Sequence, residues 1–183
     1  MIIERGIDQT KMDDISDAAD LGRQTLYNHF PGKQECVLAA VVSAYSRHTA
    51  AAEKKITPDL DPAAAIANGI LGFINGLLRD PITKHLQKHP KLLATAMNNS
   101  AAPLLKRDIQ RGLELGRFHP ALDETQLSSM LIWSIVGLIN DDKDLIAHLD
   151  SALLAFTSAF LMTLGLSLED ALEVTANSIS RPV

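Results

Sequence analysis

The sequence predicts an all-α fold in which a small helical module precedes a larger helical domain. Apolar residues recur at spacings of three and four along most of the 183-residue chain, which is the period of amphipathic helices. Alternating, strand-like patterns are almost absent, and clusters of Pro, Gly, Asn and Asp separate the periodic stretches. A hydrophobic fraction of 46% and a charged fraction of 21% are typical of a globular protein with a sizeable core.

The same composition excludes several classes of protein. No apolar run reaches the roughly 18 residues that a membrane span needs, and residues 1–6 lack the pattern of a secretory signal. The single cysteine, Cys36, excludes an intramolecular disulfide and is expected to pack as a small hydrophobe. We therefore expect a cytoplasmic protein without a membrane partner. The net charge of −5 does not exclude DNA, because DNA binding needs only a local basic surface.

The N-terminal part of the chain predicts two short helices followed by a long one. Residues 12–19 and 23–30 form the short helices, and a tight turn at residues 20–22 joins them. Pro31 and Gly32 end the second helix. The predicted units are a helix-turn-helix module over residues 1–33, a connecting helix over 34–55 and a larger helical domain over 56–183.

Proline and aspartate mark the helices of the larger domain. Proline fits the first turn of a helix, and an aspartate before that turn accepts hydrogen bonds from its amides. On these grounds Pro103 begins a helix and Asp123 caps the next one. The predicted helices are 62–79, one or two short helices within 82–99 interrupted at Pro90, 103–116, 124–140, 144–164 and a short helix over 167–176.

Two short helices joined by a tight turn can form a helix-turn-helix, whose second helix enters the major groove of DNA. By spacing alone, a generic helical hairpin with a solvated polar face is equally compatible. From residue 6 to residue 33, however, the sequence GIDQTKMDDISDAADLGRQTLYNHFPGK resembles the DNA-binding region of the TetR family of bacterial transcriptional regulators. The stretches Thr25-Leu26-Tyr27 and His29-Phe30-Pro31, with Lys33 just beyond, carry most of this resemblance. It is specific over residues 6–38, whereas the rest of the chain agrees in the number, length and order of its helices.

The resemblance implies a role for each residue of the motif. Arg23, Gln24 and Asn28 face outward on the second helix, where Arg pairs with guanine and Gln or Asn with adenine. The residues predicted to contact DNA are Thr10, Arg23, Gln24, Thr25, Tyr27, Asn28, His29 and Lys33. The residues predicted to form the small core behind them are Ile15, Ala19, Leu21, Leu26 and Phe30. Family members have a full helix before the motif, and we expect residues 1–5 to form only a truncated first helix. The surplus of acidic over basic residues within residues 1–33 counts against DNA binding.

The helices predicted at 124–140 and 144–164 carry apolar residues on nearly all of their faces. A helix without a polar face must be buried on several sides, which in a chain of this size indicates a partner subunit. The resemblance likewise implies a homodimer, in which two helices from each subunit form a four-helix interface. The alternative is a monomer whose last helices are central in its own core. The residues predicted at the dimer interface are Leu131, Ile135, Leu138, Leu149, Leu153, Phe156 and Phe160.

The helix predicted over residues 62–79 carries three glycines on one stripe and two asparagines amid apolar neighbours. Close helix contact is the commoner reason for such glycines, and space for a ligand is the less common one. The asparagines fit equally well as polar anchors of a pocket or as surface residues. The residues predicted to form a ligand pocket are Asn68, Gly72, Phe73, Asn75, Met97 and Trp133.

The sequence predicts no catalytic residue, metal site or cofactor, so we do not expect an enzyme. His85 and His89 lie four residues apart without an evident third ligand, which favours a solvated pair. The function we expect is that of a TetR-type repressor, a homodimer that binds a palindromic operator in double-stranded DNA and is released by a small-molecule ligand. The alternative is a dimeric small-molecule-binding or interaction protein that has lost DNA binding.

Overall fold

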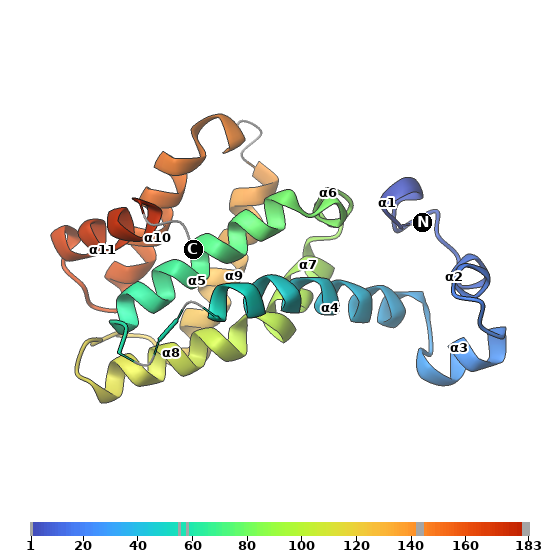
Figure 1. The fold of residues 1–183 in the computed structure, drawn as a ribbon, viewed down its shortest axis with the longest axis horizontal. Helices are drawn as coiled ribbons and strands as arrows, with labels where there is room; N and C mark the ends of the chain where they lie inside the picture. Colours follow the sequence, from blue (N-terminus) through green and yellow to red (C-terminus); the bar gives the residue numbers. More distant parts are fainter. Residues whose placement is uncertain (1, 55, 58, 142–144, 181–183) are drawn as a thin grey trace.

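The protein is described by a computed structural model that covers residues 2–54, 56–57, 59–141 and 145–180, and this part is all-helical. Figure 1 shows a small module of short helices at one end of the long axis, and a long helix, α4, that runs from this module into a larger bundle. We call residues 2–32 the head, α4 (Lys33–Glu53) the connecting helix, and the bundle from α5 to α11 the body. The head contains α1 (Ile2–Arg5), α2 (Met12–Ala18) and α3 (Arg23–His29).

The body packs its helices around α5, which contacts α4, α8, α10 and α11. Its elements are α5 (Pro62–Arg79), α6 (Pro81–Leu86), α7 (Pro90–Ser100), α8 (Ala102–Glu114), α9 (Glu124–Asp141), the 3-10 turn η1 (Leu145–His148), α10 (Leu149–Thr163) and α11 (Leu168–Ser180). Figure 1 shows α10 and α11 on the side of the body farthest from the head. The all-α prediction is confirmed.

Aspartates begin three of these helices. Asp61 and Asp80 each accept a hydrogen bond from the amide two residues ahead, at 3.1 Å, and a proline follows each directly. The carboxylate of Asp123 accepts hydrogen bonds from the amides of Thr125 and Gln126, both at 2.9 Å. The predicted cap at Asp123 is therefore present, and these bonds satisfy amides that have no partner inside the helix.

Two predicted segments differ from the structure in detail. The stretch 82–99 contains two helices, and Pro90 begins the second instead of interrupting it. The stretch 144–164 is a 3-10 turn followed by an α-helix that begins at Leu149, while residue 144 lies outside the described residues. Proline favours the first helical turn over the interior because its ring fits there without the loss of a hydrogen bond.

The connecting helix is anchored deep in the body through Tyr45. This side chain is fully buried, its ring meets the ring of Phe73 edge-on at 5.9 Å, and its hydroxyl lies 3.2 Å from Oγ1 of Thr83. Burial raises the pKa of Tyr45 to about 12, so the phenol stays neutral. The N-terminal end of α4, at Lys33, carries the head.

Within the described residues, the stretch Leu145–Thr163 is long and apolar enough to cross a membrane by length and composition. The same two properties describe a core helix of a bundle. Here the stretch combines η1 with α10, carries Asp150 in its first α-helical turn, and packs against α11 and α5.

Candidate DNA-binding surface and ligand cavity

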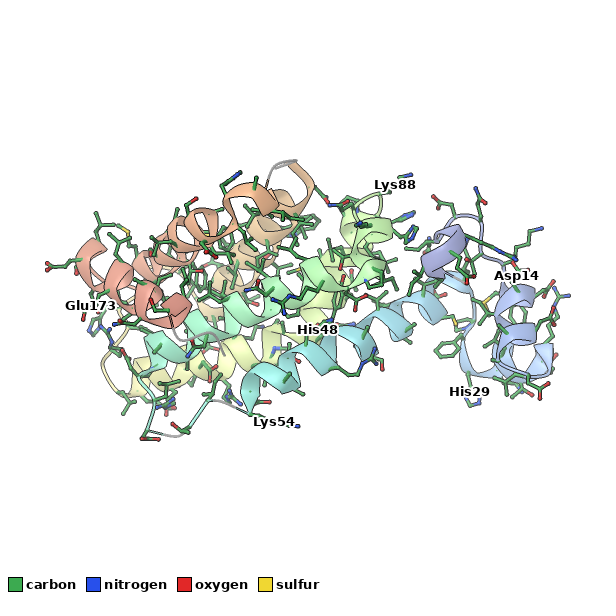
Figure 2. The ribbon with its side chains drawn as sticks, turned by 45° about the horizontal axis from the view of Figure 1, so that its top comes forward. Asp14, His29, His48, Lys54, Lys88 and Glu173 are labelled. Atoms are coloured by element: carbon green, nitrogen blue, oxygen red, sulfur yellow. The ribbon has the colours of Figure 1, made fainter. Side chains whose placement is uncertain are left out.

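The second helix of the helix-turn-helix, α3, presents a polar face to solvent. Its apolar side is anchored by Leu26, which is only 3% exposed. The exposed polar residues of α3 are Arg23, Gln24, Thr25, Tyr27, Asn28 and His29. Figure 2 shows His29 in the head, at the opposite end of the molecule from Glu173 of α11. This arrangement leaves the polar face of α3 open to a large partner.

The polar face of α3 is ordered by contacts of its own. Nε of Arg23 lies 3.0 Å from Oδ1 of Asp13 in α2, an ion pair, and the guanidinium carbon of Arg23 lies 5.8 Å from the centre of the Tyr27 ring. Gln24, the residue after Arg23, donates from Nε2 to Oδ1 of Asn28 at 3.1 Å, one turn further along α3. The side chains expected to contact bases therefore already have defined directions.

Two residues predicted to contact DNA make hydrogen bonds within the head. Thr10 is fully buried, and its hydroxyl donates to the carbonyl of Gly6 at 2.8 Å, so it is not available to a phosphate. Lys33 donates from Nζ to the carbonyls of Ile7 and Asp8, at 3.1 and 3.2 Å. These bonds tie the first turn of the connecting helix to the loop before α2.

The small core of the head also differs from the prediction. Met12 and Ser16 of α2 are buried, whereas Leu21 is 44% exposed. Asp20, directly before Leu21, has a φ of 52°, which lies in the left-handed region that residues other than glycine rarely adopt. Leu26 is buried as expected.

Two histidines of the body reach the head. His85 of α6 lies with Nε2 3.0 Å from the carbonyl oxygen of Ile3 in α1. His89, just before α7, lies with Nε2 3.4 Å from Oδ1 of Asp8. The pair predicted to be solvated is therefore half-buried at the contact between head and body.

The body contains an apolar cavity of about 70 Å³ beside the connecting helix. Its walls come from α4, α5, α7, α8 and α9, and they include Ile66, Ile70, Phe73, Met97, Leu131 and Ile132. Phe73 and Met97 line it as predicted. Four other predicted pocket residues lie outside its lining, namely Asn68, Gly72, Asn75 and Trp133. Asn75 donates to the carbonyl of Leu71 at 2.9 Å, and Trp133 is 48% exposed.

One end of this cavity is charged. Asp108 of α8 is 5% exposed and its Oδ1 accepts from Nε of Arg107 at 2.9 Å, while Nη2 of Arg107 lies 2.9 Å from the same oxygen. Burial raises the pKa of Asp108 above its ordinary value, and hydrogen bonding and attraction to Arg107 oppose this. The same Arg107 bonds through Nη1 to Glu53, the last residue of the connecting helix. An open groove of about 490 Å³ begins on the other side of Glu53, Arg107 and Asp108.

The sequence analysis missed this charged cluster. The available signal was an aspartate on the inward face of an amphipathic helix, because Asp108 shares that face with Leu105 and Gly112. Arg107, which joins Asp108 to Glu53, lies 54 residues from Glu53 in the sequence. A local sequence pattern does not predict a contact over that separation.

The predicted dimer residues divide into two groups. Leu131, Ile135, Leu153 and Phe160 are between 2% and 5% exposed, so the core of the single chain already buries them. The half-buried residues of the prediction are Leu138, Leu149 and Phe156. The large apolar side chains left exposed on α9, η1, α10 and α11 are Trp133, Ile146, Met162, Leu168 and Leu172.

Comparisons with known proteins agree with this geometry. The family model of the bacterial regulatory proteins of the tetR family matches residues 1–40, which comprise the head and the start of the connecting helix. No curated protein sequence matches the chain.

The solved structures similar to this chain include RolR in two states. RolR in complex with resorcinol superposes with a TM-score of 0.80 at 25% identity, over 100% of this chain and 88% of that chain. RolR without ligand gives a TM-score of 0.78 at 24% identity, over 96% and 90%. The fatty acid degradation regulator FadR from Bacillus halodurans gives 0.60 at 17% identity, over 89% and 87%. The helix-turn-helix with its exposed α3 and the all-helical body agree with these similarities. The N-terminal 40 residues match the TetR family of bacterial transcriptional regulators, and the fold of the chain is that of TetR-family regulators.

Proposed function

We propose that two copies of this chain bind a palindromic operator through α3, and that a small hydroxylated aromatic ligand in the body releases them. The observation that carries the DNA-binding part is the division of α3 into a buried anchor, Leu26, and an exposed face with Arg23, Gln24 and Asn28. Arg pairs with guanine and Gln or Asn with adenine in the major groove, so this face offers direct readout of both.

The remaining exposed residues of α3 support contacts to the DNA backbone. Thr25, Tyr27 and His29 carry hydrogen-bonding groups at the edges of the face. Phosphate contacts of this kind fix the position of a reading helix without reading sequence. Lys33 and Thr10 support α3 indirectly, because their hydrogen bonds hold the loop before α2 in place.

The apolar surface of α9, η1, α10 and α11 supports a homodimer. Trp133, Ile146 and Met162 are each more than 40% exposed, and solvation of such side chains is unfavourable. Their burial in a two-fold interface stabilises the dimer and sets the two heads at a fixed separation. Successive major grooves lie about 34–36 Å apart, and this separation defines the two half-sites of the operator.

The cavity supports a ligand with one apolar ring and polar groups at one end. Its walls are apolar, while Asp108 offers an acceptor and Arg107 offers donors at the charged end. RolR, which shares the fold, has been solved with resorcinol, an aromatic ring with two hydroxyls. We therefore propose a phenol-like ligand whose hydroxyl donates to the Asp108 carboxylate.

The size of the cavity supports a mechanism for release. A cavity of roughly 150 Å³ is known to hold benzene, and the free volume here is about 70 Å³. A ring therefore enters only when the walls move apart. The movable wall is the Glu53–Arg107 pair, which separates the cavity from the open groove. Displacement of Glu53 moves the end of the connecting helix, and the opposite end of that helix carries the head.

The experiment is fluorescence anisotropy with the duplex that the protein selects from a randomised pool, and with a scrambled duplex of equal length. We expect the selected duplex to bind more tightly, and binding to weaken by about a hundredfold or more from 50 to 200 mM salt. Addition of resorcinol to the complex should lower the anisotropy. The absence of a salt-sensitive complex contradicts operator binding, and an intact complex at saturating resorcinol contradicts the ligand class.

One observation favours a second function, a dimeric small-molecule-binding protein that does not read DNA. The exposed surface of α2 and of the turn that follows it carries Asp13, Asp17 and Asp20, which repel phosphates. The same experiment separates the two functions, because the second predicts resorcinol binding to the free protein without any complex on either duplex.

A further inference from the structure

The strongest feature outside the mechanism above is the ion pair between Asp13 and Arg23. Asp13 lies in the first turn of α2, and its Oδ1 lies 3.0 Å from Nε of Arg23. The side chains of Arg23 and Asp13 are 67% and 52% exposed, so the pair lies on the outside of the head, at the face of α3 proposed to contact DNA. An exposed pair of this kind adds little to folding stability. We therefore consider how the pair affects DNA binding.

The geometry of the pair leaves part of Arg23 free. A guanidinium has five N–H donors, and the contact with Asp13 is made at Nε, not at Nη1 or Nη2. The Tyr27 ring lies 5.8 Å from the guanidinium carbon and limits rotation of the group. The outer edge with Nη1 and Nη2 remains available, and this edge is a donor pair of the kind that guanine O6 and N7 accept.

We propose that Asp13 is a specificity-determining positioning residue, which directs Arg23 toward a guanine and disfavours its contact with phosphates. This inference rests on the proposed operator binding. A carboxylate beside the guanidinium repels phosphate groups, whereas a guanine edge is neutral and carries acceptors that the free N–H groups satisfy. Asp13 therefore lowers the affinity for every duplex and lowers it most for duplexes without the correct guanine.

The neighbouring aspartates of α2 have different surroundings. Asp14 accepts from the amide of Lys11 at 2.9 Å and so belongs to the start of the helix. Asp17 is exposed one turn further along the same helix face and carries the same charge. Asp17→Asn is therefore a matched control, because it removes one negative charge from α2 and leaves the Arg23 pair intact.

The test measures affinity for the selected duplex and for its scrambled form in wild type, D13N, D13E and D17N. In D13N we expect the affinity for the scrambled duplex to rise by about fivefold or more. The slope of log affinity against log salt concentration should steepen by about 0.9 for each head, as one extra phosphate contact predicts. The ratio of the two affinities should fall by about fivefold or more. D13E keeps a carboxylate within reach of Arg23 and should retain most of the ratio, and D17N should retain all of it. Circular dichroism verifies that each variant is folded.

The double variant D13N/R23A separates positioning from charge. If Asp13 acts through Arg23, D13N changes the ratio in the R23A background no more than D17N does in wild type. Equal ratios for wild type and D13N, or equal falls for D13N and D17N, overturn the inference while operator binding stands. The absence of any salt-sensitive complex with wild type overturns operator binding, and the inference with it.

Discussion

Nε2 of His48 lies 3.0 Å from Oδ2 of Asp80, which fastens the connecting helix to the start of α6. The same carboxylate accepts from the amide of Ile82 at 3.1 Å, so Asp80 both caps α6 and holds α4. Because α6 also reaches the head through His85, any displacement of α6 acts on the head by two routes, along α4 and directly.

We expect Asp80→Ala to lower the free energy of unfolding by about 2 kcal/mol, since it removes the cap and the bond to His48 together. Asp80→Asn keeps a capping oxygen and should lose about 1 kcal/mol or less. Urea unfolding at one fixed protein concentration measures both. Equal losses in the two variants would show that the cap has no part in the effect.

Two glycines in the helices of the body should respond in opposite directions to a methyl group. A Cβ at Gly112 would lie 1.9 Å from Cδ2 of Phe118, a fully buried ring, so Gly112→Ala must displace that ring. A Cβ at Gly69, in α5, would meet no atom within 4 Å. We expect Gly112→Ala to destabilise the protein by about 1–3 kcal/mol and Gly69→Ala to stabilise it by up to about 1 kcal/mol through helix propensity. Thermal unfolding followed by circular dichroism checks both, and a stabilised Gly112→Ala contradicts the close packing at Phe118.

These glycines illustrate which parts of the fold the sequence predicts. Helix positions follow from local periodicity and from prolines and aspartates at the first turns, and the structure agrees to within a few residues. The contacts of Gly112 with Phe118, and of Arg107 with Glu53, depend on how distant segments meet, which local patterns do not contain. Thr10 shows the same limit within the motif. Its hydroxyl satisfies a carbonyl of the preceding loop, and nothing in the residue type separates that role from a phosphate contact.

The ion pairs of Arg117 should make stability depend on acid pH. Arg117 donates to both oxygens of Asp170 at 2.6 and 2.9 Å and also to Asp61 at 3.1 Å, which ties the start of α11 to the start of α5. The hydrogen bonds from Arg117 hold the pKa of Asp170 below its ordinary value. A lowered carboxyl pKa contributes stability above the ordinary value, near 3.9, and the contribution is lost as the pH falls through the folded-state pKa.

We therefore expect Asp170→Asn to be less stable than wild type at pH 7, by less than about 1 kcal/mol because the pair is partly exposed. The difference should shrink below about pH 4. Urea unfolding at both pH values measures it, with Glu173→Gln on the exposed side of the same helix as the control. A difference that persists unchanged at pH 3 contradicts an ionic origin.

The exposed apolar surface of α9 should decide the oligomeric state. Trp133 is 48% exposed, and a charge placed there must be desolvated when two subunits meet. If the chain forms the proposed dimer, we expect Trp133→Glu to be a monomer at micromolar concentration where wild type is a dimer, as measured by light scattering after size-exclusion chromatography. Leu115→Glu is the matched control, because Leu115 is 64% exposed but lies at the end of α8, outside the proposed interface. A dimer that survives Trp133→Glu places the interface elsewhere.

The charged end of the cavity should control ligand affinity more than folding. Burial raises the pKa of Asp108, so the ionised carboxylate opposes folding as the pH rises above its ordinary value. The Asp108→Asn variant, whose neutral amide has the same shape as the carboxylate, should therefore fold with little loss of stability. A hydrogen bond to a charged acceptor contributes about 1.5–3 kcal/mol, so we expect Asp108→Asn to weaken resorcinol binding by about tenfold or more in a calorimetric titration. Glu114→Gln, on the exposed side of the same helix, should bind as wild type does. Equal affinities for wild type and Asp108→Asn would place the hydroxyl of the ligand on another group, because the carboxylate is the acceptor that the proposed complex requires.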